Sequence, residues 1–132
     1  MVFPIDSGKS KYDSGFTFVE LMVVMAIIAL LISIALPRYF DGLKHAKEAV
    51  LHEDLANMRS AIDHFYADKA VYPNTLDDLV NLRYLRFIPV DPVTERADTW
   101  QTDMPPDKSS HVYDVHSGSN DISTDGTPYS TW

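Results

Sequence analysis

The sequence lacks cysteine and is poor in basic residues. With no cysteine among its 132 residues, a disulfide framework, a cysteine-ligated zinc site and a thiol nucleophile are all excluded. Lys and Arg number 11 against 19 Asp and Glu, which gives a formal net charge of −8. Phosphate binding needs clustered Lys and Arg, so nucleic acid is not an expected partner.

The length and the distribution of residue types predict one domain. The chain has no internal repeat, and its low-complexity sequence is confined to the Ser, Thr, Gly and Asp of residues 117–130. Without its one long apolar run, the chain keeps about 95 residues, which is near the lower size of independently folding domains.

That apolar run extends from Phe16 to Leu36. About 21 residues at roughly 1.5 Å each give about 32 Å of helix, enough to cross the hydrocarbon core of a bilayer. Glu20 is the exception within it, and an ionised carboxylate in lipid must be paired or neutralised. Its partner would be another chain, the mature amino terminus or a proton.

The first fifteen residues are polar and join the apolar run directly. Their two lysines are cancelled by two aspartates. A secretory signal peptide would be cleaved after the run, behind small residues. Here the run ends in Ala35-Leu36-Pro37-Arg38 and continues into a helical pattern, so cleavage there is not expected.

Gly15-Phe16-Thr17-Phe18-Val19-Glu20, followed by the apolar run and Pro37, resembles the processing signal of type IV prepilins. The resemblance implies that residues 1–15 are a leader, which a membrane peptidase removes by cutting between Gly15 and Phe16. It also implies N-methylation of Phe16 and a role for Glu20 in assembly. Because the charges around the run do not favour a cytoplasmic amino terminus, the expected orientation rests on the resemblance alone.

Beyond Pro37 the helical pattern resumes. Pro37 is expected to kink the helix without ending it, so one helix is predicted from Phe16 to about Ala70. Apolar residues at spacings of three and four form a stripe on its second half. The stripe comprises Leu43, Ala46, Val50, Leu51, Leu55, Met58, Ile62, Phe65 and Tyr66.

The remaining residues predict a small cover for that stripe. Tyr72-Pro73 breaks the helix, and a short capped helix is expected from Asn74 to about Leu82. Strands are expected near 99–102 and at 111–116. The predicted class is α+β, a long N-terminal helix packed on a small antiparallel sheet. The predicted divisions are a leader at 1–15, a membrane-spanning helix at 16–37 and a globular domain at 38–132.

A second resemblance lies in the globular part. Tyr72-Pro73, Ile88-Pro89-Val90-Asp91-Pro92, and Tyr113 to Ser117 leading into an Asp-rich tail are similar to the major pseudopilin of type II secretion. Val93-Thr94 stands where that family usually has Trp-Gly. The resemblance implies a single-pass protein of the bacterial inner membrane with its globular domain in the periplasm. Its expected partners are further copies of itself, other pseudopilins, the inner-membrane assembly platform and the prepilin peptidase.

The same resemblance implies one bound calcium ion in the tail loop. Asp121 and Asp125 would be the side-chain ligands, with Gly118 and Ser123 as carbonyl donors. Calcium takes several oxygen ligands in flexible loops. The alternative is a plain surface turn, since Ser, Asn, Gly and Asp are the usual turn residues.

Three functions stay open at this stage. The first is a structural subunit of a type II secretion pseudopilus, which assembles into a filament that drives protein export across the outer membrane. The second is a subunit of a surface type IV pilus for adhesion or motility. The third is a signal-anchored enzyme or binding protein, which is disfavoured because no catalytic or phosphate-binding pattern is present. A metal on the helix face of His45, Glu48 and His52 is disfavoured, since such faces are usually solvated.

Overall fold

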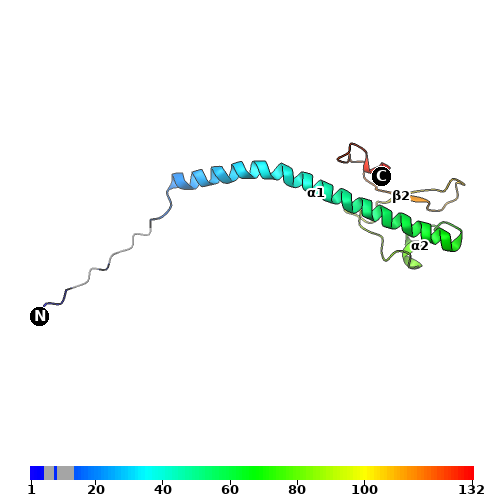
Figure 1. Ribbon diagram of the computed structural model, residues 1–132, viewed down its shortest axis with the longest axis horizontal. Helices are drawn as coiled ribbons and strands as arrows, with labels where there is room; N and C mark the ends of the chain where they lie inside the picture. The colour runs from blue at the N-terminus through cyan, green and yellow to red at the C-terminus, as the bar shows by residue number, and fades with distance from the viewer. Residues whose placement is uncertain (5–7, 9–13) are drawn as a thin grey trace. The chain divides into compact units, whose positions relative to one another are not determined.

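The computed structural model describes residues 1–4, 8 and 14–132 (Figure 1). Its elements in chain order are α1 (Phe18–Lys69), α2 (Leu76–Asn81), β1 (Gln101–Asp103), β2 (Asp114–His116) and a 3₁₀ turn η1 (Tyr129–Thr131). Residues 1–38 and 39–132 form two separate compact units, each described by itself below. Most of the predicted leader, including Lys9 and Lys11, lies outside the described residues.

Helix α1 confirms the long helix predicted from the apolar pattern, to within two residues at either end. It begins after Thr17, whose Oγ1 accepts the backbone N–H of Glu20 at 3.2 Å. The helix continues through Pro37. In the first unit, the large apolar side chains from Phe18 to Leu36 are between 44% and 75% exposed. Among the described residues, α1 is the one helix long and apolar enough to cross a membrane.

The cover predicted for the second half of α1 is present in the second unit, and α2 and β2 flank this part of the helix in Figure 1. Strands β1 and β2 pair antiparallel, with Thr102 opposite Val115. The short helix starts as expected, because the carboxylate of Asp78 accepts the backbone N–H groups of Asn74 and Thr75 at 3.0 and 3.2 Å. The fold is therefore α+β, and the strands are shorter than the sequence predicted.

The core of the second unit lies along one stripe of α1. Its α1 members are Leu51, Leu55, Met58, Ala61, Ile62 and Phe65, which alternate mainly at spacings of four and three. Leu79 of α2, Val115 of β2 and the tail residue Tyr129 complete it, together with Trp100 and Val112. Trp100 satisfies its indole N–H with the carbonyl of Pro89 at 2.8 Å. Apolar burial thus joins α1, α2, β2 and η1, whereas all three residues of β1 are exposed.

The predicted stripe was wrong at its edges. Leu43, Val50 and Tyr66 are 42%, 47% and 45% exposed, because the small sheet and the tail cover only the central line of the helix. Ala61 is buried although it was not predicted. Glu48, predicted to lie on the polar face, is only 6% exposed, because Thr124 and Tyr129 of the tail pack on its carboxylate.

Candidate functional site

The predicted processing site lies immediately before α1. Gly15 and Phe16 are in non-helical, exposed backbone, and the Phe16 side chain is 85% exposed. Peptidases act on extended segments, so the local conformation is compatible with cleavage there. Cleavage and N-methylation themselves stay predictions.

Glu20 is the third residue of α1 and is exposed. Thr17-Phe18-Val19-Glu20 has the spacing of a capping box, and the Thr17 half of that motif is formed. A carboxylate in the first turn also lies favourably in the helix dipole. Within the described part of the chain, Glu20 makes no ion pair, so a partner from another chain stays the prediction.

The C-terminal tail is fastened to α1 by a buried carboxylate. Oε1 of Glu48 accepts the backbone N–H of Thr124 and the hydroxyl of Tyr129, both at 2.7 Å. Oε2 accepts the Thr124 hydroxyl, and Nδ1 of His45 lies 3.8 Å away. One side chain of α1 thus holds two residues of the tail that are more than 70 positions away in sequence.

These contacts decide the charge state of Glu48. Burial by itself would raise the pKa of its carboxyl group, but the hydrogen bonds from Thr124 and Tyr129 outweigh it, so the pKa lies below its ordinary value. The Tyr129 hydroxyl shifts in the opposite sense, because burial and its bond to Glu48 raise its pKa strongly. The pair is therefore an ionised carboxylate that accepts from a neutral phenol.

A second anchor holds the end of the tail. Arg59 of α1 donates to Oδ1 of Asp114 at 2.7 Å, to the carbonyl of Val115 at 2.9 Å and to the carbonyl of Trp132 at 2.7 Å. The ring of His52 stacks on Trp132 with centroids 4.0 Å apart. Arg59 thereby joins α1, β2 and the tail.

Asp91 joins the tail to the loop that follows α2. Its side chain is fully buried, and Oδ1 accepts the backbone N–H groups of Val93 and Thr94 at 2.8 and 3.3 Å. Oδ2 accepts the Ser117 hydroxyl at 2.6 Å. The Asp of the Ile88-Pro89-Val90-Asp91-Pro92 motif is therefore a structural carboxylate.

The predicted calcium ligands fall into two groups. Asp121 and Asp125 are exposed, and neither carboxylate accepts a hydrogen bond from another described residue. The carbonyl of Ser123 already accepts the N–H of Gly126 at 3.1 Å. Gly118 packs so closely on the Thr99 carbonyl that a Cβ would lie 1.9 Å from its oxygen, so packing alone requires glycine there.

This donor set fits calcium in type, with two free carboxylates and carbonyl oxygens. The number of donors is small, since the described residues contain no group of three or more His, Cys, Asp or Glu that could hold a metal. When bound, the ion would neutralise the two carboxylates, and water would have to complete its ligands. Calcium binding stays a prediction. His45, Glu48 and His52 make contacts to each other and to the tail.

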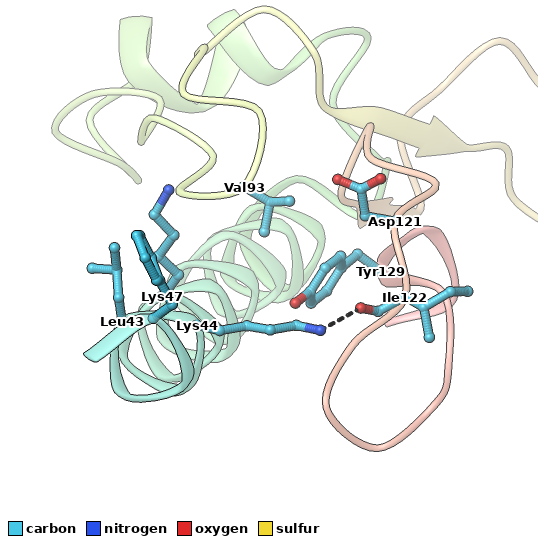
Figure 2. Close-up of a pocket in the computed structure, with 8 residues that line it drawn as sticks. Leu43, Lys44, Lys47, Val93, Asp121, Ile122 and Tyr129 are labelled. Atoms are coloured by element: carbon cyan, nitrogen blue, oxygen red, sulfur yellow. Dashed lines mark hydrogen bonds between the residues drawn. The ribbon is translucent and has the colours of Figure 1, made fainter. Parts of the chain in front are cut away.

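A groove of about 500 Å³ opens beside the Glu48 anchor (Figure 2). We call it the Lys44 groove. Phe40 and Leu43 of α1 and Ile122 of the tail line it, and Figure 2 shows Leu43 and Ile122 on opposite sides. Lys44 reaches across from α1 and donates to the carbonyl of Ile122 at 2.9 Å.

The groove carries charges of both signs. Lys44 and Lys47 line it from α1, and Asp121 lines it from the tail. Lys47 also pairs with Glu95 at 3.0 Å, whose side chain is 76% exposed. Exposed pairs of this kind contribute about 0–1 kcal/mol, so Lys47 is available to another partner.

The sequence did not indicate Lys44, Glu48, Arg59 or Asp91 as organising residues. Lys44, Glu48 and the buried helix residue Leu51 follow one another at spacings of four and three, so they extend the core stripe toward the start of the globular part. A charged residue in register with a core stripe is the signal that could have found Glu48.

A family model described as the prokaryotic N-terminal methylation motif matches residues 10–36. The type II secretion system core protein G of Pseudomonas aeruginosa is 30% identical over 100 residues, which cover 64% of this chain and 70% of that protein. The same protein of Pectobacterium carotovorum is 30% identical over 101 residues, 76% of this chain and 65% of that protein.

Type IV pilins match over a shorter stretch. The fimbrial protein EcpC of Eikenella corrodens is 39% identical over 63 residues, 48% of this chain and 41% of that protein. The type IV major pilin protein PilE of Neisseria gonorrhoeae is 38% identical over 63 residues, 46% of this chain and 36% of that protein. The chain thus spans less than half the length of these two pilins. No solved structure matches it.

Proposed function

The chain belongs to the family of type IV pilin-like prepilins, and we propose that it is a structural, non-catalytic subunit of a type II secretion pseudopilus. The observation that carries this proposal is the extent of the matches. Similarity to core protein G covers 64% to 76% of the chain, whereas similarity to the two pilins covers 46% to 48%. The similarity to core protein G therefore includes more of the globular part than the similarity to the pilins does.

In this proposal the first unit is both a membrane anchor and a filament core. Before assembly, the exposed apolar side chains of Phe18–Leu36 lie in the inner membrane, and the globular unit lies in the periplasm. Apolar helices gain little hydrophobic energy by associating in lipid, so packing and polar pairing must drive assembly there. Once out of the bilayer, the same surface must be covered by other subunits.

Glu20 supplies that polar pairing. After cleavage behind Gly15, the amino group of Phe16 is the nearest cation that every copy carries. We assign it as the partner of Glu20 on a neighbouring copy, since the low dielectric strengthens the attraction and makes either charge costly alone. The prepilin peptidase, other pseudopilins and the assembly platform are the partners that this role requires.

The experiment that tests the function is deletion of the gene in the source bacterium. Proteins normally exported are expected to accumulate in the periplasm, while surface pili and surface motility persist. Re-expression of the wild-type chain should restore export. Loss of surface pili with unchanged export would assign the chain to a surface type IV pilus, the alternative that the similarity to PilE favours.

A further inference from the structure

The Lys44 groove lies at one end of the globular unit, and an exposed tip lies at the other. The tip, Asp103–Lys108, comprises the last residue of β1 and the first part of the loop that leads toward β2. Its Met104 side chain is 64% exposed. Asp107 lines a small hollow together with Tyr66 and Tyr72, at the C-terminal end of α1.

The two surfaces are far apart along one helix. Phe40 of the groove and Tyr66 beside the tip are both on α1, and 26 helical steps at 1.5 Å correspond to about 40 Å. A contact between two different surfaces at opposite ends of a subunit does not close into a dimer. Repeated from copy to copy, it propagates as a filament.

The two surfaces are also complementary in charge. The groove carries Lys44, Lys47 and Asp121, two cations and one anion. The tip carries Asp103, Asp107 and Lys108, two anions and one cation, and all three residues are exposed.

Lys44, Asp103 and Asp107 already make hydrogen bonds within the chain, but each can form more. Lys44 donates one hydrogen bond to a neutral carbonyl, which leaves two donors and its full charge. Asp103 accepts from His116 through Oδ2, and Asp107 accepts from Ser109 through Oδ1, so each keeps one free oxygen. The exposed apolar side chain of Met104 lies between these carboxylates in the sequence. It is suited to pack against the apolar groove residues Phe40, Leu43 and Ile122.

We propose that the Lys44 groove of one copy receives the Asp103–Lys108 tip of the next copy. Met104 enters between the apolar walls, and Asp103 and Asp107 face Lys44 and Lys47. The proposal rests on the proposed function as a filament subunit and identifies a contact between globular units, in addition to the packing of the apolar helices.

Disulfide cross-linking tests the contact without background, because the chain has no cysteine. Met104→Cys combined with Ile122→Cys places one thiol on the tip and one on the groove, and it leaves the Ile122 carbonyl in place for Lys44. In the full-length protein assembled in membranes, mild oxidation should give a ladder of covalent oligomers. The matched control combines Met104→Cys with Val50→Cys, an exposed position on α1 that does not line the groove.

The ladder should exceed that of the control by about tenfold, the population ratio that corresponds to about 1.4 kcal/mol. Charge reversal adds a second readout. Lys47→Glu or Asp107→Lys alone should reduce the ladder, and the two together should restore it. An equal ladder in the control would reveal random collision and overturn the proposal.

Electron microscopy of filaments isolated from the cell envelope separates this inference from the proposed function. Filaments that form normally without the ladder would overturn the groove contact and leave the filament role intact. The groove would then have another occupant, such as a phospholipid headgroup. Absence of filaments from the wild-type chain in a bacterium that secretes normally would overturn the function itself.

Discussion

At the scale of single residues, the carboxylate of Glu48 carries the attachment of the tail to α1. It accepts three hydrogen bonds, from Thr124 and Tyr129, in a site from which water is largely excluded. Its ionised form is the one that these donors stabilise. Removing this carboxylate should therefore lower the free energy of unfolding, and protonating it in acid should have a similar effect.

Glu48→Ala should lower the free energy of unfolding by about 3 kcal/mol, because it leaves buried donors without an acceptor. The measurement is denaturant unfolding of the full chain in detergent, followed by tryptophan fluorescence. Glu53→Ala is the matched control, an exposed glutamate on the same helix, and should change stability by no more than about 0.5 kcal/mol. Equal effects of the two substitutions would contradict the anchoring role.

The stabilisation by Glu48 should disappear in acid. Its pKa is lower in the folded protein than its ordinary value of 4.5, so the unfolded state binds the proton more readily. The contribution is therefore complete above the unfolded pKa and is lost as pH falls through the folded pKa. The difference in unfolding free energy between wild type and Glu48→Gln should shrink below about pH 4.5. A difference that stays constant down to pH 3 would contradict this assignment.

Glu20 gives the corresponding prediction for assembly. Glu20→Ala should still be inserted and cleaved, because insertion depends on the apolar run, but filament formation should be lost or strongly reduced. Glu20→Gln is the control that keeps the shape without the charge. The measurement is the yield of filaments isolated from the cell envelope, by microscopy, alongside immunoblots of leader cleavage. Assembly of Glu20→Ala at the wild-type rate would remove this residue from the mechanism.

At the scale of elements, the sequence carries enough information for the helices and too little for the tail. Helix α1 has an apolar run and then a stripe at helical spacing, so its bounds were predictable to two residues. Strands β1 and β2 have three residues each, too short for alternation to define their ends. The register of Glu48 with the core stripe indicates that it is buried. Its partners Thr124 and Tyr129 are more than 70 residues away, and a local sequence pattern cannot identify them. Polar residues buried by distant partners are the general reason why the candidate site was less predictable than the fold.

The tail loop is also where the calcium prediction applies. Asp121 and Asp125 carry uncompensated charge in an acidic chain, and a bound cation would relieve their repulsion. At 1 mM calcium, binding with a dissociation constant of about 10⁻⁴ M would add roughly 1.4 kcal/mol to stability. The thermal midpoint of the full chain in detergent should therefore rise with calcium relative to chelator, and Asp121→Asn or Asp125→Asn should abolish the rise.

Asp107→Asn is the control for that experiment, since Asp107 is exposed but outside the tail. Equal midpoints in calcium and chelator would reduce the loop to an ordinary turn. The tail would still be held in that case, because Glu48, Lys44 and Arg59 attach it to α1 through protein groups alone.

At the scale of the whole molecule, the two units have different proposed tasks. The first unit exposes apolar residues along its helix, which suits lipid before assembly and neighbouring subunits afterwards. The second unit has its own core, and its surfaces set the contacts between globular parts. In the proposed assembly, the pairing of Glu20 requires removal of the leader, because only a chain that begins at Phe16 places a free amino group near it.

The mass of the intact protein, purified from the membrane of its source bacterium, is the most direct test of the proposed processing. We expect a chain that begins at Phe16 and carries one additional methyl group on its amino terminus. Gly15→Ala is the control and should leave the leader attached. A mature terminus beyond Ala35 would contradict the account, because the chain would then have lost both its anchor and Glu20.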